Sequence, residues 1–96
     1  MQLRNNQRVQ ICDSVLFQTV RDESVLLEME TQRYYGLDDV GTRVWTLLRE
    51  FGSVNDVASH LQLEFDADLE SLRSDVYALV QKMASAGLVK VTEVGS

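Results

Sequence analysis

Hydrophobic and polar residues follow a strand-like pattern in the first third of the chain and a helical pattern in the rest. Residues 9–11 and Val15–Val20 are short runs rich in β-branched and aromatic residues, which is typical of strands. The polar residues 21–24 separate the second run from a third. This arrangement predicts a hairpin, with residues 25–30 as the third strand.

The third predicted strand alternates strictly between apolar and mixed positions. Its two faces carry, respectively, Val25, Leu27 and Met29, and Leu26, Glu28 and Glu30. A period of two with one apolar face predicts a half-buried strand. We expect this strand to be the last of a small sheet, so that one edge keeps unpaired N–H and C=O groups.

Three helices are predicted after the strands, because apolar residues recur there at helical spacing. Each is expected to begin after a side chain that accepts hydrogen bonds from the first turn. These expected N-caps are Asp38 or Asp39, Ser53, and Asp66. The helices are expected to end at Gly52, near Leu61 and at Gly87, with a short terminal strand at 88–92.

The order of these elements predicts an α+β fold. A three-stranded antiparallel sheet followed by three helices is the layout of a winged helix-turn-helix domain with the sheet placed first. The length of 96 residues and the 45% hydrophobic content suit one globular domain over residues 1–96.

The charge balance opposes nucleic-acid binding. Nine basic residues stand against fifteen acidic ones, and residues 51–96 carry three basic and seven acidic groups. DNA binding depends on a positive patch, and a helix-turn-helix motif presents the start of its second helix to the major groove. Here that helix would present Asp66, Asp68 and Glu70. The charges therefore indicate a neutral or basic partner instead.

Groups able to perform bond chemistry are few. Cys12 is the sole cysteine and His60 the sole histidine, so they cannot supply the four ligands of a structural zinc site. Phosphate-loop, zinc-protease and serine-hydrolase motifs are missing. We expect no catalytic residue, no metal and no cofactor, and we interpret the chain as a binding protein that is not an enzyme.

The start of the chain lacks the apolar core of a signal peptide, and no apolar run approaches the ~20 residues of a membrane span. We therefore expect the protein to be cytoplasmic.

The third predicted helix has an apolar arc wider than a single core contact requires. Val76 and Met83 lie at its centre, where a purely structural role fits as well as a binding one. One side of the arc carries Leu72, Asp75, Leu79 and Lys82. A free strand edge beside that side predicts capture of an extended peptide as an added strand.

Residues 25–48 resemble the PqqD family. The matching elements are Leu26-Leu27, Thr31, Tyr34-Tyr35, Leu37-Asp38, Gly41, Trp45 and Leu47-Leu48. Further positions that fit the layout are Val57, Leu61, Leu69 and Gly87-Leu88, so the resemblance covers nearly the whole chain.

The resemblance implies a recognition element for ribosomally synthesised and post-translationally modified peptides (RiPPs). Such a domain binds the leader of a precursor peptide on its third strand, in a groove against its third helix. The implied peptide-binding residues are Val25, Leu26, Leu27, Glu28, Met29, Glu30, Tyr34, Leu72, Asp75, Val76, Leu79 and Lys82. Trp45 and Gly41 are assigned to folding.

A separate chain of this length most resembles the recognition protein of lasso-peptide pathways. Such a protein presents the precursor to a leader peptidase before an ATP-dependent cyclase acts, and we expect a monomer or weak dimer. Two alternatives stay open: a PqqD-type chaperone serving a radical enzyme, and a winged-helix DNA-binding or regulatory domain.

Overall fold

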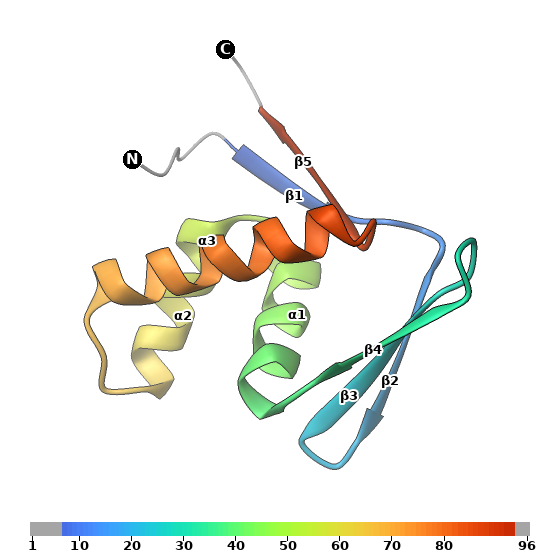
Figure 1. Ribbon diagram of the computed structural model, residues 1–96. Helices are drawn as coiled ribbons and strands as arrows, with labels where there is room; N and C mark the ends of the chain where they lie inside the picture. The colour runs from blue at the N-terminus through green and yellow to red at the C-terminus, as the bar shows by residue number, and fades with distance from the viewer. Residues whose placement is uncertain (1–6, 94–96) are drawn as a thin grey trace.

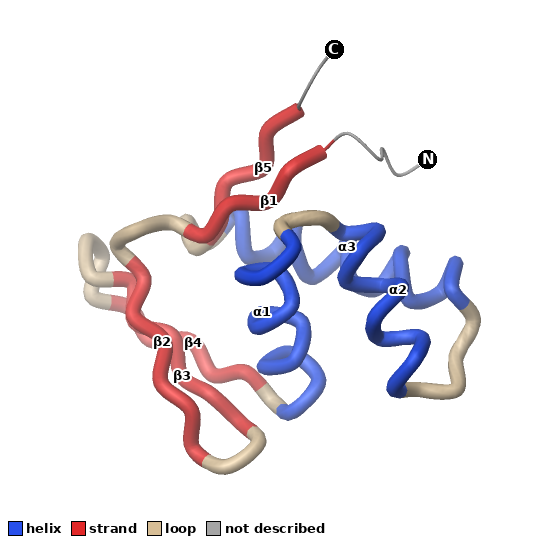
Figure 2. The backbone as a smooth tube through the Cα atoms, turned by 180° about the vertical axis from the view of Figure 1, so that it is seen from behind, coloured by secondary structure: helices blue, strands red, loops and turns tan. Residues whose placement is uncertain are grey.

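Two separate sheets accompany three helices in the computed structural model, which describes residues 7–93 (Figure 1). The strands are β1 (Gln7–Ile11), β2 (Val15–Val20), β3 (Glu23–Glu28), β4 (Arg33–Leu37) and β5 (Val89–Glu93). The helices are α1 (Asp39–Phe51), α2 (Val54–Glu64) and α3 (Leu69–Ser85). Figures 1 and 2 view the molecule from opposite sides, and both place α1 between α2 and the sheet formed by β2, β3 and β4.

The larger sheet is an antiparallel meander in the order β2-β3-β4. Val20 pairs with Glu23, so a turn of two residues joins β2 to β3, and Arg21 adopts a left-handed φ of 60° in it. Residues 29–32 then form the turn to β4, where Gln32 has a φ of 59°. The α+β fold with a three-stranded antiparallel sheet and three helices is confirmed, although the membership of the sheet differs from the prediction.

The prediction that residues 25–30 form an edge strand is wrong. Strand β3 runs from Glu23 to Glu28 and has a partner on each side, since Leu26 pairs with Phe17 of β2 and with Tyr35 of β4. The missed strand β4 occupies the edge instead. Its backbone groups on the side away from β3 have no strand partner within residues 7–93.

The inward face of β3 was also assigned incorrectly. Leu26 is fully buried, whereas Val25 and Met29 are 39% and 45% exposed. Two polar residues, Ser24 and Glu28, share the buried face with Leu26. Their polarity in the sequence made this face look solvent-exposed. Their burial is possible because each has a hydrogen-bond partner: Ser24 Oγ lies 2.7 Å from Thr42 Oγ1, and Ser14 Oγ donates to Glu28.

The first predicted strand belongs to a different sheet. Strand β1 pairs antiparallel with β5, and Val9 lies opposite Val91. Figure 1 shows this ribbon beside the helices, away from β2 and β3. The N–H of Val9 also donates to the carbonyl of Gly52 over 2.9 Å, which attaches the ribbon to the end of α1.

Two of the three expected N-caps are confirmed. Asp38 accepts a hydrogen bond from the N–H of Gly41, and Ser53 accepts one from the N–H of Asp56. The third is wrong, because the cap of α3 is Asp68, whose side chain accepts from the N–H of Ser71. Helix α2 also continues beyond Leu61 to Glu64.

The ends of the first and third helices agree with the prediction. Gly52 ends α1 with a φ of 66°, and Gly87 follows α3 with a φ of 78°. Glycine adopts the left-handed region at little steric cost, so a glycine marks the end of each of these two helices.

The hydrophobic core lies where α1 meets α2, α3 and the inward face of the larger sheet. Trp45 of α1 is 1% exposed, and its ring stacks on Phe17 of β2 at a centroid distance of 6.3 Å. Val80 and Met83 contribute from α3, with 1% and 3% exposure. The structural role expected for Trp45 is consistent with this position.

Candidate functional site

An open cleft of about 540 Å³ lies where the end of β4 and the start of α1 face α3. Its lining is mostly apolar and comes from four elements and the linker before α1. The lining residues are Gly36, Leu37, Asp38, Val40, Gly41, Val44, Leu61, Leu72, Asp75, Val76 and Leu79. A concave apolar site with a few polar groups is the usual form of a binding site in a protein.

Helix α3 forms one wall of the cleft. The wall residues are Leu72, Asp75, Val76 and Leu79, which are four of the five α3 residues that the family resemblance implies for peptide binding. Their spacing of three and four residues puts them on one face of a helix. Val76 is 2% exposed and packs in the core as well, while Leu72 and Leu79 are half-buried.

The opposite wall is the junction between β4 and α1. Val40 is 45% exposed although it is apolar, because its side chain borders the cleft instead of the core. Gly41 brings this wall close to the strand: a Cβ atom there would lie 3.2 Å from Asp38 Oδ1 and 3.3 Å from Leu37 Cδ2. The expectation that Gly41 serves close packing is consistent with these distances.

The cleft borders the free edge of the larger sheet. Gly36 and Leu37 belong both to the cleft lining and to edge strand β4. Tyr34, at the other end of this strand, is 71% exposed. Within residues 7–93, the site therefore combines strand backbone that has no partner on one side with a mostly apolar wall on α3.

The sequence analysis did not predict edge strand β4, because its five residues were interpreted as the segment that leads into the first helix. Two signals could have revealed it. Tyr34 and Tyr35 are of a residue type that favours strands, and the polar residues 30–32 precede them. Strand-favouring residues that follow a polar turn are a normal signature of a strand.

Several predicted site residues lie elsewhere. None of Val25, Leu26, Leu27, Glu28, Met29 and Glu30 lines the cleft, because β3 is separated from it by β4. Leu27 and Met29, which the resemblance implied for peptide binding, therefore do not face α3 across the cleft. Lys82 is an exposed residue of α3, one turn beyond Leu79, and does not line the cleft.

The polar groups of the cleft are two carboxylates. Asp38 is engaged as the cap of α1, with Oδ1 2.8 Å from the N–H of Gly41. Asp75 is exposed and has no hydrogen bond or ion pair with another residue of the described range. A basic or hydrogen-bond-donating group in the cleft would find Asp75 available.

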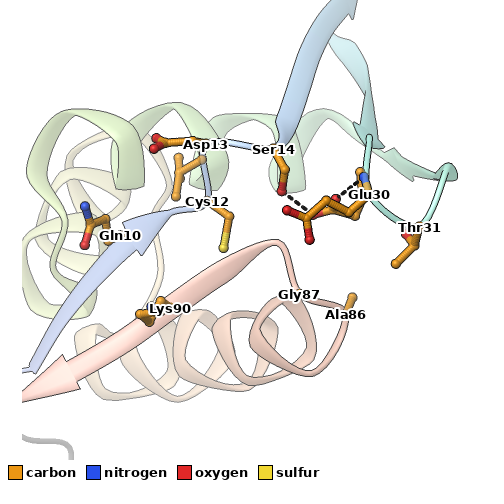
Figure 3. Close-up of a pocket in the computed structure, with 11 residues that line it drawn as sticks. Gln10, Cys12, Asp13, Ser14, Glu30, Thr31, Ala86, Gly87 and Lys90 are labelled. Carbon is orange, nitrogen blue, oxygen red and sulfur yellow. Dashed lines mark hydrogen bonds between the residues drawn. The ribbon is translucent and has the colours of Figure 1, made fainter.

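A second, polar pocket of about 420 Å³ lies where the loop after β1 approaches the end of α3 (Figure 3). Ser14 Oγ donates to Glu28 Oε2 over 2.8 Å, and the N–H of Glu30 donates to Glu28 Oε1 over 2.7 Å. Each oxygen of this buried carboxylate therefore has a partner. The arrangement holds the turn after β3, and we interpret it as structural.

The two groups with potential reactivity lie in different elements of the fold. Cys12 lies in the loop after β1, where its N–H donates to the carbonyl of Leu88. His60 lies on α2, stacked on Phe51 with ring centroids 4.2 Å apart. Within residues 7–93, no cluster of three or more histidine, cysteine or acidic side chains could hold a metal ion. No helix in this range has the length and apolar character needed to cross a membrane.

Comparison with known proteins identifies relatives of both the sequence and the fold. Residues 23–89 match the family described as "Coenzyme PQQ synthesis protein D (PqqD)". No curated protein matches the chain.

Two solved structures are similar over most of the chain. The structure described as "TbiB1 in Complex with the TbiA(beta) Leader Peptide" is 31% identical with a TM-score of 0.81, and the match covers 84% of this chain and 94% of TbiB1. The structure described as "Lasso peptide synthetase B1 complexed with the leader peptide" is 22% identical with a TM-score of 0.79, covering 86% and 98% of the two chains. At that identity the second structure supports the fold alone.

Proposed function

The chain belongs to the PqqD family, and on that premise we propose that it binds the leader region of a ribosomally synthesised precursor peptide. The leader would add as a strand to the free edge of β4, with part of its side chains in the cleft against α3. This role requires no bond chemistry from the protein itself.

The observation that carries the proposal is the position of edge strand β4, whose outer side has no strand partner within residues 7–93, beside an apolar cleft. Main-chain groups on the outer edge of β4 offer hydrogen bonds to any extended peptide. The cleft offers selectivity, because Val40, Leu72 and Leu79 present apolar surface to one face of such a peptide. An added strand would lie about 4.8 Å from β4, with alternate side chains pointing toward the cleft.

The charge of the proposed site favours a leader with a basic residue. Asp75 is the carboxylate of the cleft that has no partner within residues 7–93, and the whole chain carries a net charge of −6. A leader that places a basic residue beside Asp75 would gain a favourable electrostatic interaction there.

Comparison with TbiB1 supports leader binding. TbiB1 is 31% identical to this chain and is described in complex with a leader peptide. The lasso peptide synthetase B1, which shares the fold, is also described with a leader peptide. The resemblance of the sequence to the separate recognition proteins of lasso-peptide pathways leads us to propose a lasso-peptide pathway over the quinone-cofactor pathway named in the description of the family.

In such a pathway the protein would act in the cytoplasm as a carrier of the precursor. We propose that it presents the precursor to a leader peptidase and then to the cyclase that closes the peptide. Holding a substrate near an enzyme raises its effective concentration, which reaches the millimolar range for short flexible linkers.

DNA binding is disfavoured by the start of α3. Asp68 caps this helix and Glu70 lies in its first turn, so carboxylates occupy the positions that would meet the phosphate backbone. Arg73, which follows in the second turn of the helix, is paired with Glu70 over 2.9 Å.

The test is fluorescence anisotropy of labelled leader peptides, taken from precursor genes encoded beside this one and titrated with the purified protein. We expect saturable binding by one leader that a DNA competitor does not displace. Leu79→Asp and Val40→Asp should weaken it at least tenfold, because each places a charge in the cleft. Val40 is 45% exposed, so its substitution should leave the fold intact even if Leu79→Asp does not.

Leu63→Asp provides a matched control. Leu63 lies near the end of α2, is 84% exposed and does not line the cleft, so this variant should bind like the wild type. The proposal fails if no neighbouring leader binds the folded protein, or if the cleft variants and the control bind equally well.

A further inference from the structure

Within residues 7–93 of the unbound protein, neither backbone conformation nor packing requires a glycine at position 36. Its φ is not in the left-handed region, and a Cβ atom built on it would meet nothing within 4 Å. It lies within edge strand β4, where glycine is unfavourable because it contributes no packing and loses much conformational freedom on folding. A glycine inside a strand often marks a place where a ligand approaches closely.

The missing side chain leaves a gap on the outward face of the sheet. Gly36 pairs with Val25 of β3, which in turn pairs with Gln18 of β2, so these three residues form one row across the sheet. Alternation places Tyr34 on the same face. Val25 and Tyr34 are 39% and 71% exposed, so apolar surface borders the gap on two sides.

Resting on the proposed function, we infer that Gly36 is a specificity-determining residue that leaves room for a bulky outward-facing side chain of the bound leader. A peptide added to β4 places one residue directly opposite Gly36, with its side chain on the same face. A large side chain there can lie over the glycine and contact Tyr34 and Val25, as aromatic residues do when they cover glycines in sheets. Aromatic side chains offer the largest contact area for this position.

The two faces of the bound peptide are selected by different parts of the protein. Side chains that point toward α3 are selected by the cleft, whereas the one opposite Gly36 points away from α3 and is selected by the gap. A Cβ at position 36 would project from the face of the sheet and not along its plane, so substitution there leaves the backbone hydrogen bonds of the edge available.

The experiment combines a protein variant with an alanine scan of the leader. Gly36→Val fills the gap with a residue that favours strands, so its melting temperature should equal or exceed that of the wild type. We expect it to bind the leader about three- to tenfold more weakly. Replacing the leader residue opposite Gly36 by alanine should weaken binding to the wild type by a similar factor, but hardly affect binding to Gly36→Val.

Gln18→Val is the matched control, because Gln18 is an exposed residue of the same row on the far strand. It should bind the leader and its alanine variants like the wild type. Equal affinity of Gly36→Val and the wild type for every leader variant would overturn the inference while leaving leader binding in place. A wild-type protein that binds no leader would overturn the proposed function, and the inference with it.

Discussion

Ser14 Oγ donates a hydrogen bond of 2.8 Å to Glu28 Oε2, and this bond joins the residue before β2 to the last residue of β3. Glu28 is only 4% exposed, and its other oxygen accepts from the N–H of Glu30. A buried carboxylate without these donors would be strongly unfavourable. The pair therefore explains how an acidic residue occupies the inward face of the sheet.

Removing the donor of this pair should destabilise the fold. Ser14→Ala leaves Glu28 Oε2 buried without its side-chain partner, which costs roughly 1–3 kcal/mol in the free energy of unfolding. Urea denaturation followed by circular dichroism measures this change. Ser74→Ala, on an exposed position of α3, is the control, and equal stability of the two variants would contradict a structural role for the pair.

The position of the cap of α3 can be tested by two neighbouring substitutions. Asp68→Ala removes the acceptor for the N–H of Ser71 and should lower the free energy of unfolding by about 1 kcal/mol. Asp66→Ala changes an exposed residue outside the helix and should have little effect. Thermal unfolding of both variants decides between them, and a larger loss for Asp66→Ala would restore the cap expected from the sequence.

The ion pair between Arg43 of α1 and Glu64 of α2 predicts a small loss of stability in acid. Hydrogen bonding to Arg43, whose Nε lies 2.9 Å from Glu64 Oε2, lowers the pKa of Glu64 below its ordinary value. A lowered pKa in the folded state means stability that is present above the unfolded pKa and lost as pH falls through the folded one.

Both partners of this pair are partly exposed, so solvent screening limits the effect to about 0.2–1 kcal/mol. Urea unfolding of the wild type and Glu64→Gln at pH 7 and pH 3 measures it. The wild type should be the more stable at pH 7, and the difference should shrink at pH 3. A difference independent of pH would show that the pair has no electrostatic role.

Asp75 should determine how leader binding responds to salt. If a basic leader residue lies beside it, Asp75→Asn weakens binding about two- to fivefold at low ionic strength, and the effect shrinks as salt screens the charge. Anisotropy titrations at two salt concentrations test this. Asp66→Asn, outside the cleft, serves as control. An unchanged leader affinity of Asp75→Asn would show that the cleft binds the leader through apolar contacts alone.

The amino-acid sequence by itself determined the local features of this protein. The caps Asp38 and Ser53 and the stop at Gly52 depend on contacts within a few residues, so composition and spacing were enough to predict them. Helical periodicity placed Leu72, Asp75 and Leu79 on one side of α3 for the same reason, but it also placed Lys82 there, which does not line the cleft. The family resemblance, carried mainly by residues 25–48, added the expectation of leader binding.

Only the tertiary structure decided which strand lies at the edge and which face of β3 is buried. Leu26 points into the core together with Ser24 and Glu28, because Thr42 and Ser14, which are 18 and 14 residues away in the chain, supply the hydrogen bonds. Strand β1 leaves the larger sheet because its partner, β5, is at the far end of the chain. Such pairings join segments that local patterns cannot relate, and they place the free edge on β4, beside the cleft.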